Sequence, residues 1–362
     1  MKKKFFPRVL MHWHYTQNKR QMPWKGEKDP YKVWLSEVIL QQTRVEQGWA
    51  YFEKFVVKYP GIQSLAAAKD EEVFKLWEGL GYYSRCKNLL ATAREIVYDY
   101  DGAFPRNYEN ILALKGIGTY TAAAISSFCF GLPYPVIDGN VLRVLARVFN
   151  IDIPIDSNGA AKIFGALAAE LIDKKDPGAY NQAIMDFGAT VCKPALPLCA
   201  ACPMQQNCGA YKAGKVNLLP VKEKTLVRKT RWLSYFIFEH NNSTLIHKRI
   251  AKDIWQNLFE FYLVETPDNP KWDKEQVHEW LENSLGIANN PRIQIFPAEA
   301  QQLTHQQVKG YFIKVALEKI PEPLAAAEFQ WLTAEQVKQL AFPRFINHNL
   351  PKNALQPELF NC

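Results

Sequence analysis

The stretch "LKGIGTYTAAAI" (114–125) places Gly116 and Gly118 between two segments of helical spacing. Glycine lets the backbone turn tightly and lets a ligand approach closely. The amides of such a turn, with the N-terminus of the helix that follows, can face a phosphate group. We therefore predict two helices joined by a hairpin over about residues 107–131. An ordinary corner between helices has similar glycines, so the surrounding motifs must decide whether this one binds a phosphate group.

The apolar spacing predicts two kinds of structure along the chain. Three- and four-residue steps indicate helices up to about residue 210. These helical segments are 29–59, 69–81, 84–100, 107–116, 119–131 and 140–149, with two more near 157–174 and 177–191. Beyond about residue 230, strands are predicted at 231–240, 243–249, 259–265, 292–296 and 311–320, with helices at 274–286 and 334–342. We predict a helical domain over 1–214, a charged linker over 215–230, and an α+β domain over 231–362.

The composition is that of a globular protein with a basic surplus. Of the 362 residues 48% are hydrophobic, and the net charge is +8. The basic start is interrupted by Pro7 and Arg8, so it does not resemble a secretory signal. We expect a cytoplasmic protein, in a compartment that disfavours disulfides. The charge fits an anionic partner such as nucleic acid, although many soluble proteins are mildly basic.

Four of the seven cysteines lie in "VCKPALPLCAACPMQQNCGA" (191–210). They are Cys192, Cys199, Cys202 and Cys208. Zinc sites usually combine two close pairs of ligands, or a pair with histidines. Iron–sulfur clusters accept four thiolates from one loop. The spacing alone leaves zinc and a [4Fe–4S] cluster equally open.

Two carboxyl groups stand in contexts that suit acid and electrostatic catalysis. Glu37 lies among apolar residues in "VWLSEVILQQT" (33–43), where burial would raise its pKa into the range of a usable acid. Asp138 precedes a predicted helix, whose N-terminus favours the ionised form. Cleavage of a glycosidic bond needs such a pair with pKa values pushed apart. A solvated helix glutamate is the usual alternative for a lone Glu, and the sequence does not establish that the two residues meet.

Together these motifs resemble those of the adenine DNA glycosylases of the MutY type, in the helix–hairpin–helix superfamily. The resemblance covers about residues 8–220. It rests on "MPWKG", "DPYKVWLSEVILQQTRVE", "WEGLGYYSRCKNL", "LKGIGTYTAAAI", "VIDGNVLRVLAR" and the cysteine loop. It implies a mainly helical glycosylase fold with one [4Fe–4S] cluster on the loop 192–208, followed by a Nudix-like α+β domain.

The resemblance also implies roles for single residues. Glu37 matches the general acid that protonates adenine, and Asp138 matches the carboxylate that stabilises the sugar cation. Tyr120 and Asn140 match residues that support this pair. The implied pocket for a flipped adenine consists of Arg20, Trp24, Leu40, Val45 and Gln182. The residues implied to contact the surrounding duplex are Gln42, Thr43, Leu80, Tyr82 and the hairpin glycines Gly116 and Gly118.

Position 120 separates two related enzymes. The sister family, endonuclease III, carries a lysine in this segment, and its amine attacks the sugar and leads to strand cleavage. This chain has Tyr120, and a phenol cannot form a Schiff base. We expect a glycosylase with little or no lyase activity.

The second domain lacks the glutamate-rich run of Nudix hydrolases, so we interpret it as a recognition module. The segment "QQLTHQQ" (301–307) lies where the resembling family has a Phe-Ser-His loop that senses 8-oxoguanine. Thr304 and His305 are carried over onto that loop, and Leu303 replaces the phenylalanine. An exposed polar loop between strands is the plainer interpretation.

The expected function is removal of adenine paired with 8-oxoguanine or guanine in duplex DNA, by a monomer on the bacterial nucleoid. The base must be flipped out, because its glycosidic bond is inaccessible inside the stack. Two alternatives remain: a non-catalytic DNA-binding protein that keeps the hairpin and the cluster, and an endonuclease III-like glycosylase with lyase activity.

Overall fold

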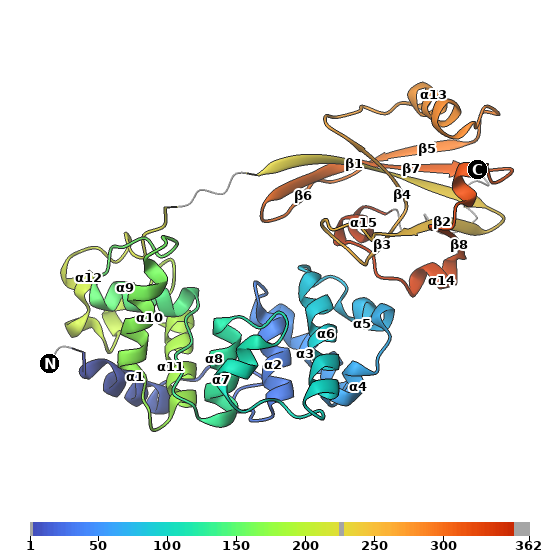
Figure 1. The fold of residues 1–362 in the computed structure, drawn as a ribbon. Helices are drawn as coiled ribbons and strands as arrows, with labels where there is room; N and C mark the ends of the chain where they lie inside the picture. The colour runs from blue at the N-terminus through green and yellow to red at the C-terminus, as the bar shows by residue number, and fades with distance from the viewer. Residues whose placement is uncertain (1–2, 224–227, 351–362) are drawn as a thin grey trace. The chain divides into compact units, whose positions relative to one another are not determined.

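The computed structural model describes residues 3–223 and 228–350 (Figure 1). The chain divides into two compact units, one of residues 1–68 and 87–225 and the other of residues 69–86 and 226–362. The division at residue 225 falls within the predicted linker. The domain limits 1–214 and 231–362 remain predictions, and residues 224–227 of the linker and 351–362 of the second domain lie outside the described part.

The first unit is helical, as the sequence predicts. Its helices are α1 (Phe5–Thr16), α2 (Pro30–Leu40), α3 (Val45–Lys58), α4 (Ile62–Ala66), α6 (Ser84–Asp99), α7 (Tyr108–Ala113), α8 (Thr119–Phe130), α9 (Gly139–Phe149), α10 (Ala160–Leu171), α11 (Pro177–Thr190) and α12 (Gly209–Lys212). The cysteine loop holds the short 3₁₀ helices η1 (Cys199–Ala201) and η2 (Gln205–Asn207). Among the described residues, no helix is both long enough and apolar enough to cross a membrane.

The prediction of one helical segment over 29–59 is wrong, because these residues form two helices, α2 and α3. Asp29 caps α2, its side chain accepting the N–H of Tyr31, and Pro30 fits the first turn because it needs no N–H partner there. The helix ends at Leu40, and Gln42 has a φ of 56° that no right-handed helix allows. The resulting corner turns the residues after Leu40 toward the site described below.

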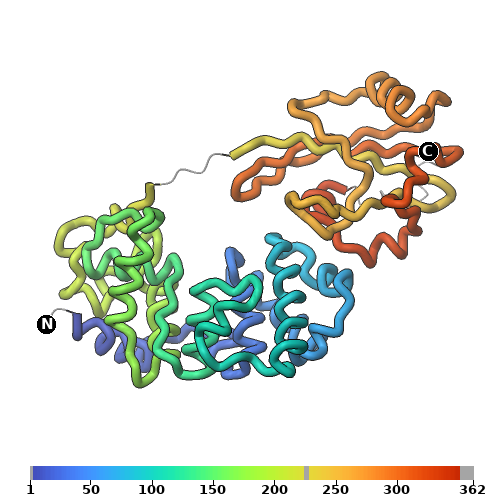
Figure 2. The backbone as a smooth tube through the Cα atoms, in the orientation of Figure 1, coloured from blue at the N-terminus to red at the C-terminus, as the bar shows by residue number. Residues whose placement is uncertain are grey.

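The core of the first unit lies between helices that are distant in sequence. Helix α11 packs against α1, α8 and α9, and the blue N-terminal helix runs beside α11 in Figure 2. Phe6 and Phe187, with Phe164 from α10, are fully buried in this core. Burial of such large apolar side chains is the main force that holds helices together. It fixes the mutual positions of α8, α9 and α11, which carry part of the site described below.

The second unit contains a mixed eight-stranded sheet and the helix α5 (Asp70–Trp77). The strands are β1 (Lys229–His240), β2 (Ser243–Lys248), β3 (Phe259–Glu260), β4 (Tyr262–Thr266), β5 (Ile293–Pro297), β6 (Gln301–Gln302), β7 (Gln306–Ala316) and β8 (Phe329–Thr333). The main path runs β3-β2-β1-β7-β5, with β4 on β1, β6 on β7 and β8 on β2. Only β1 and β7 pair in parallel among the described strands.

The helices of the sheet unit are α13 (Lys274–Leu285), η3 (Glu322–Ala325), α14 (Ala334–Lys338) and α15 (Arg344–Asn349). The predicted α+β class is confirmed, but several elements differ locally, and β6 and α15 were not predicted. The strand predicted at 259–265 is split at Phe261, β7 begins at Gln306 instead of 311, and the sequence prediction missed β8. The first residues of β7 pair with β1 and with β6, so tertiary contacts rather than local spacing set its start.

Candidate active site and cysteine loop

Glu37 is buried on α2, with 7% of its surface exposed. Burial raises the pKa of its carboxyl from 4.5 to about 7; a hydrogen bond from Tyr120 lowers it, and the nearby charge of Asp138 raises it. Desolvation is the largest of the three causes, because a low-dielectric site disfavours the charged form. At neutral pH this carboxyl is therefore partly protonated and able to act as an acid.

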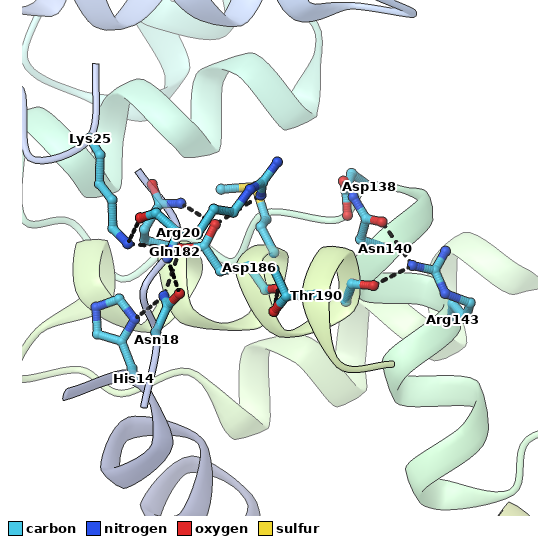
Figure 3. A network of polar contacts seen from close by, with 12 residues as sticks. His14, Asn18, Arg20, Lys25, Asp138, Asn140, Arg143, Gln182, Asp186 and Thr190 are labelled. Carbon is cyan, nitrogen blue, oxygen red and sulfur yellow. Dashed lines mark hydrogen bonds and ion pairs between the residues drawn. The ribbon is translucent and has the colours of Figure 1, made fainter. Parts of the chain in front are cut away.

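Asp138 is the N-cap of α9. Its Oδ1 accepts the backbone N–H of Val141 at 2.7 Å, and its Oδ2 accepts the Asn140 side-chain amide at 2.7 Å. The Arg143 guanidinium in turn donates to Oδ1 of Asn140 at 2.8 Å (Figure 3). These donors hold a negative charge at a fixed place, at the end of the helix that favours it.

Tyr120 lies in the first turn of α8, directly after the hairpin. Its hydroxyl donates to the Met185 sulfur at 3.3 Å and also interacts with Glu37. Burial, followed by the charges of Glu37 and Asp138, raises the pKa of the Tyr120 hydroxyl well above its usual value. The phenol therefore stays protonated and serves as a neutral neighbour of both carboxyl groups.

One hollow of about 490 Å³ brings most of the predicted site residues together. The predicted residues that border it are Arg20, Trp24, Glu37, Leu40, Gln42, Thr43, Val45, Tyr120, Asp138, Asn140 and Gln182. The sequence analysis missed Met22, Gln41 and Met185, which also line it. Met22 and Gln41 lie in the quoted motifs "MPWKG" and "DPYKVWLSEVILQQTRVE", but no chemical group of these two residues marks them as pocket residues, and Met185 lies in none of the quoted motifs. Glu37, Trp24 and Gln182 also border a second hollow of about 220 Å³.

The hairpin glycines lie outside this hollow, between α7 and α8. Gly116 has a φ of 74°, and a Cβ there would come within 2.6 Å of the Asn88 side chain. Gly118 is the N-cap of α8. Both glycines are exposed, so the amides of the turn remain accessible to a ligand.

The four cysteines of the loop border one hollow between α9 and α11. A guanidinium nitrogen of Arg147 lies 3.6 Å from the Cys192 sulfur, and the Cys208 thiol donates to the backbone carbonyl of Arg147 at 3.4 Å. Within residues 3–223 and 228–350, no three His, Cys, Asp or Glu side chains converge so as to hold a single metal ion. Four cysteine thiols around one hollow, with a cation beside one of them, form a donor set that fits a metal cluster bound by four thiolates.

The remaining predicted residues belong to the second unit. Leu80 is 6% exposed and Tyr82 is 42% exposed, and both lie in the segment 69–86. Thr304 and His305 form the turn between β6 and β7. The hydroxyls of Tyr82 and Thr304 are hydrogen-bonded to each other.

A helical unit with an exposed glycine hairpin, a buried carboxylic acid and a capped carboxylate on one hollow defines a base-excision DNA glycosylase. Residues 35–163 match the sequence model of a family described as HhH-GPD superfamily base excision DNA repair protein. Residues 234–350 match a family described as NUDIX domain. The predicted Nudix-like class of the second domain is thereby confirmed.

The chain belongs to the adenine DNA glycosylases. It is 36% identical over 284 residues to the adenine DNA glycosylase of Buchnera aphidicola subsp. Acyrthosiphon pisum, covering 78% of each chain. It is 44% identical over 223 residues to the adenine DNA glycosylase of Mus musculus, covering 58% of this chain and 43% of the mouse protein. The predicted family is confirmed.

Two solved structures support the fold of the helical part. A thermostable thymine-DNA glycosylase shares 31% identity with a TM-score of 0.55, and the match covers 59% of this chain and 97% of that one. A trapped endonuclease III–DNA covalent intermediate shares 21% identity with a TM-score of 0.51, covering 59% of this chain and 99% of that one. The second likeness concerns the fold alone.

Proposed function

We propose that this adenine DNA glycosylase removes adenine paired with 8-oxoguanine or guanine, by acid-assisted cleavage of the N-glycosidic bond in base excision repair. The observation that carries the proposal is the shared hollow of Glu37 and Asp138. A single acid has nothing to stabilise the sugar cation, and a single carboxylate cannot release a poor leaving group. The site of action is duplex DNA, which we place on the bacterial nucleoid.

Glu37 supplies the proton. In its protonated form the buried carboxyl donates to a ring nitrogen of the flipped adenine, which converts the base into a better leaving group. A pKa of about 7 keeps a usable fraction of that form at neutral pH. The Tyr120 hydroxyl positions the carboxyl without entering the reaction as a nucleophile.

Asp138 stabilises the positive charge that develops on the sugar. Its two oxygens accept hydrogen bonds from Val141 and Asn140, so the carboxylate is oriented before the substrate arrives. A preorganised charge costs no reorganisation when the transition state forms. Water then adds to the sugar cation at C1′ and loses a proton, which gives an abasic site. Tyr120 supplies no amine to attack the sugar instead, so little or no strand cleavage follows.

The cysteine loop holds one [4Fe–4S] cluster on Cys192, Cys199, Cys202 and Cys208 in this proposal. Arg147 supports that assignment, because it donates to the carbonyls of Lys193 and Pro194 in the same loop. When bound, the cluster ties the loop together through four metal–thiolate bonds. The chain's own part is to hold Lys193 and its neighbours in place for contact with the DNA backbone.

The second unit supplies recognition of the opposite base. Thr304 and His305 lie on the turn between β6 and β7, where an exposed imidazole can contact an oxidised guanine. Preference is measured as the ratio of excision rates opposite 8-oxoguanine and opposite guanine. His305→Ala should lower this ratio, and an unchanged ratio would remove the loop from the proposal.

The deciding experiment uses a duplex with adenine opposite 8-oxoguanine, incubated with protein and then treated with alkali. We expect cleavage by the wild type and a loss of about 10²–10⁴-fold in single-turnover rate for Glu37→Gln. Glu46→Gln, an exposed carboxyl in the first turn of α3, is the matched control. Absence of cleavage by the wild type would favour a non-catalytic DNA-binding protein, and a strand break without alkali would favour the endonuclease III-like alternative.

A further inference from the structure

Asp186 has no part in the proposed chemistry and does not line the hollow of about 490 Å³, but it contacts two residues that do. Asp186, on α11, has a side chain that is 0% exposed. Its Oδ1 accepts hydrogen bonds from Arg20 at 2.9 Å and from Gln182 at 2.9 Å (Figure 3). Its Oδ2 accepts one from Asn18 at 2.8 Å and lies 3.2 Å from the Lys25 amine. A buried charge is tolerated only with such partners.

The charge of Asp186 determines which way the Gln182 amide faces. A carboxylate can only accept hydrogen bonds, so the atom of Gln182 that lies 2.9 Å from it must be the amide nitrogen. The carbonyl oxygen then faces away from the carboxylate and is the acceptor that Gln182 offers to the two hollows it borders.

Asp186 also holds in place the segment between α1 and α2, which contributes Arg20 to the lining of the hollow. The Lys25 amine bridges from Asp186 to the backbone carbonyl of Arg20, at 2.8 Å from that oxygen. The Asn18 side chain binds Asp186 through its nitrogen and accepts the backbone N–H of Arg20 at 3.1 Å. The irregular segment between α1 and α2 is thus tied to α11, and the guanidinium of Arg20 keeps further N–H donors beside the hollow.

We propose that Asp186 is a specificity-determining positioning residue, which selects a purine with an amino group at C6. It sets an acceptor, the Gln182 carbonyl, next to a donor, the Arg20 guanidinium. Adenine presents the complementary pair, an amino donor beside a ring-nitrogen acceptor. A 6-oxopurine presents the reverse pattern and would leave polar groups unpaired. This inference rests on the proposed function, since it concerns the base that the same hollow receives.

The test compares single-turnover excision of adenine with that of purine, which has only hydrogen at C6. Both bases are placed opposite 8-oxoguanine in the same duplex. For Asp186→Asn we expect the adenine-to-purine rate ratio to fall at least about tenfold, the scale of one well-made hydrogen bond. Thr190→Val is the matched control, because Thr190 donates to the backbone carbonyl of Asp186 at 2.8 Å and leaves its carboxylate untouched. Its ratio should stay at the wild-type value.

A merely structural role of Asp186 would lower both rates by the same factor, and that result overturns the proposal. If Asp186→Asn does not fold, Gln182→Leu carries the test, because it keeps the buried carboxylate with its partners Arg20, Lys25 and Asn18. It must reduce the adenine-to-purine ratio to the same extent, and an unchanged ratio also overturns the proposal. Failure of the proposed function is distinguishable, since the wild type would then release neither base.

Discussion

Glu37 and Asp138 border the same hollow, and the charge of Asp138 is one of the causes that raise the pKa of Glu37 to about 7. The two carboxyl groups thus have different environments. Glu37 is surrounded by apolar helix residues, whereas Asp138 receives a backbone N–H and a side-chain amide. This division suits one group to donate a proton and the other to remain an anion.

The rate of adenine excision should fall as the pH rises through about 7, because the protonated form of Glu37 is the donor and is lost above its pKa. The measurement is a pH series of single-turnover rates for the wild type. The rate of the Glu37→Gln variant should show no such fall near pH 7. A wild-type profile that is flat from about pH 6 to about pH 8 would contradict the assignment of the acid.

Tyr120→Phe should move this fall in rate to higher pH. The hydrogen bond from Tyr120 lowers the pKa of Glu37, and its removal leaves burial and the Asp138 charge, which both raise it. The shift is measured on the same pH series. Met185→Leu serves as a control, because it removes the sulfur that the hydroxyl contacts at 3.3 Å but keeps the phenol. A fall at lower pH in Tyr120→Phe would refute this account.

Glu37 should reduce the stability of the fold at neutral pH. Its folded pKa is raised above 4.5, so between about pH 4.5 and about 7 the folded state binds more protons than the unfolded state. Stability then falls as the pH rises, by up to about 3 kcal/mol for this group. Glu37→Gln, which stays neutral, should therefore gain stability relative to the wild type at pH 8 and little at pH 4. Urea unfolding at both pH values measures the difference, and an equal gain at both would speak against a raised pKa.

Replacement of a loop cysteine should remove the metal. Cys199→Ser is expected to lose the visible absorbance of an iron–sulfur cluster and the iron content, which should be about four atoms per chain in the wild type. Cys129→Ser is the matched control, because Cys129 lies on α8 outside the loop and should keep its iron. One zinc ion per chain and no iron in the purified wild type would contradict the assignment of an iron–sulfur cluster to this loop.

Several features could be predicted from the sequence because they depend on local chemistry. The hairpin needs Gly116, whose φ of 74° and contact with Asn88 exclude a side chain. Asp138 precedes a helix and caps it, as its position indicates. The strand predicted at 259–265 breaks at Phe261 and the helix predicted over 29–59 breaks near Gln42, because the apolar spacing continues across both breaks and does not indicate them.

By itself the sequence determined the family and the two classes of domain, and it predicted the candidate catalytic residues, because these depend on residue types at short spacings. The tertiary structure decided which of those residues share a hollow, how far Glu37 is desolvated, and that Asp186 is buried against Arg20, Lys25 and Gln182. Such properties come from the packing of α2, α8, α9 and α11 against one another. A pKa and the orientation of an amide depend on neighbours that are far away in the chain, and no local pattern contains them.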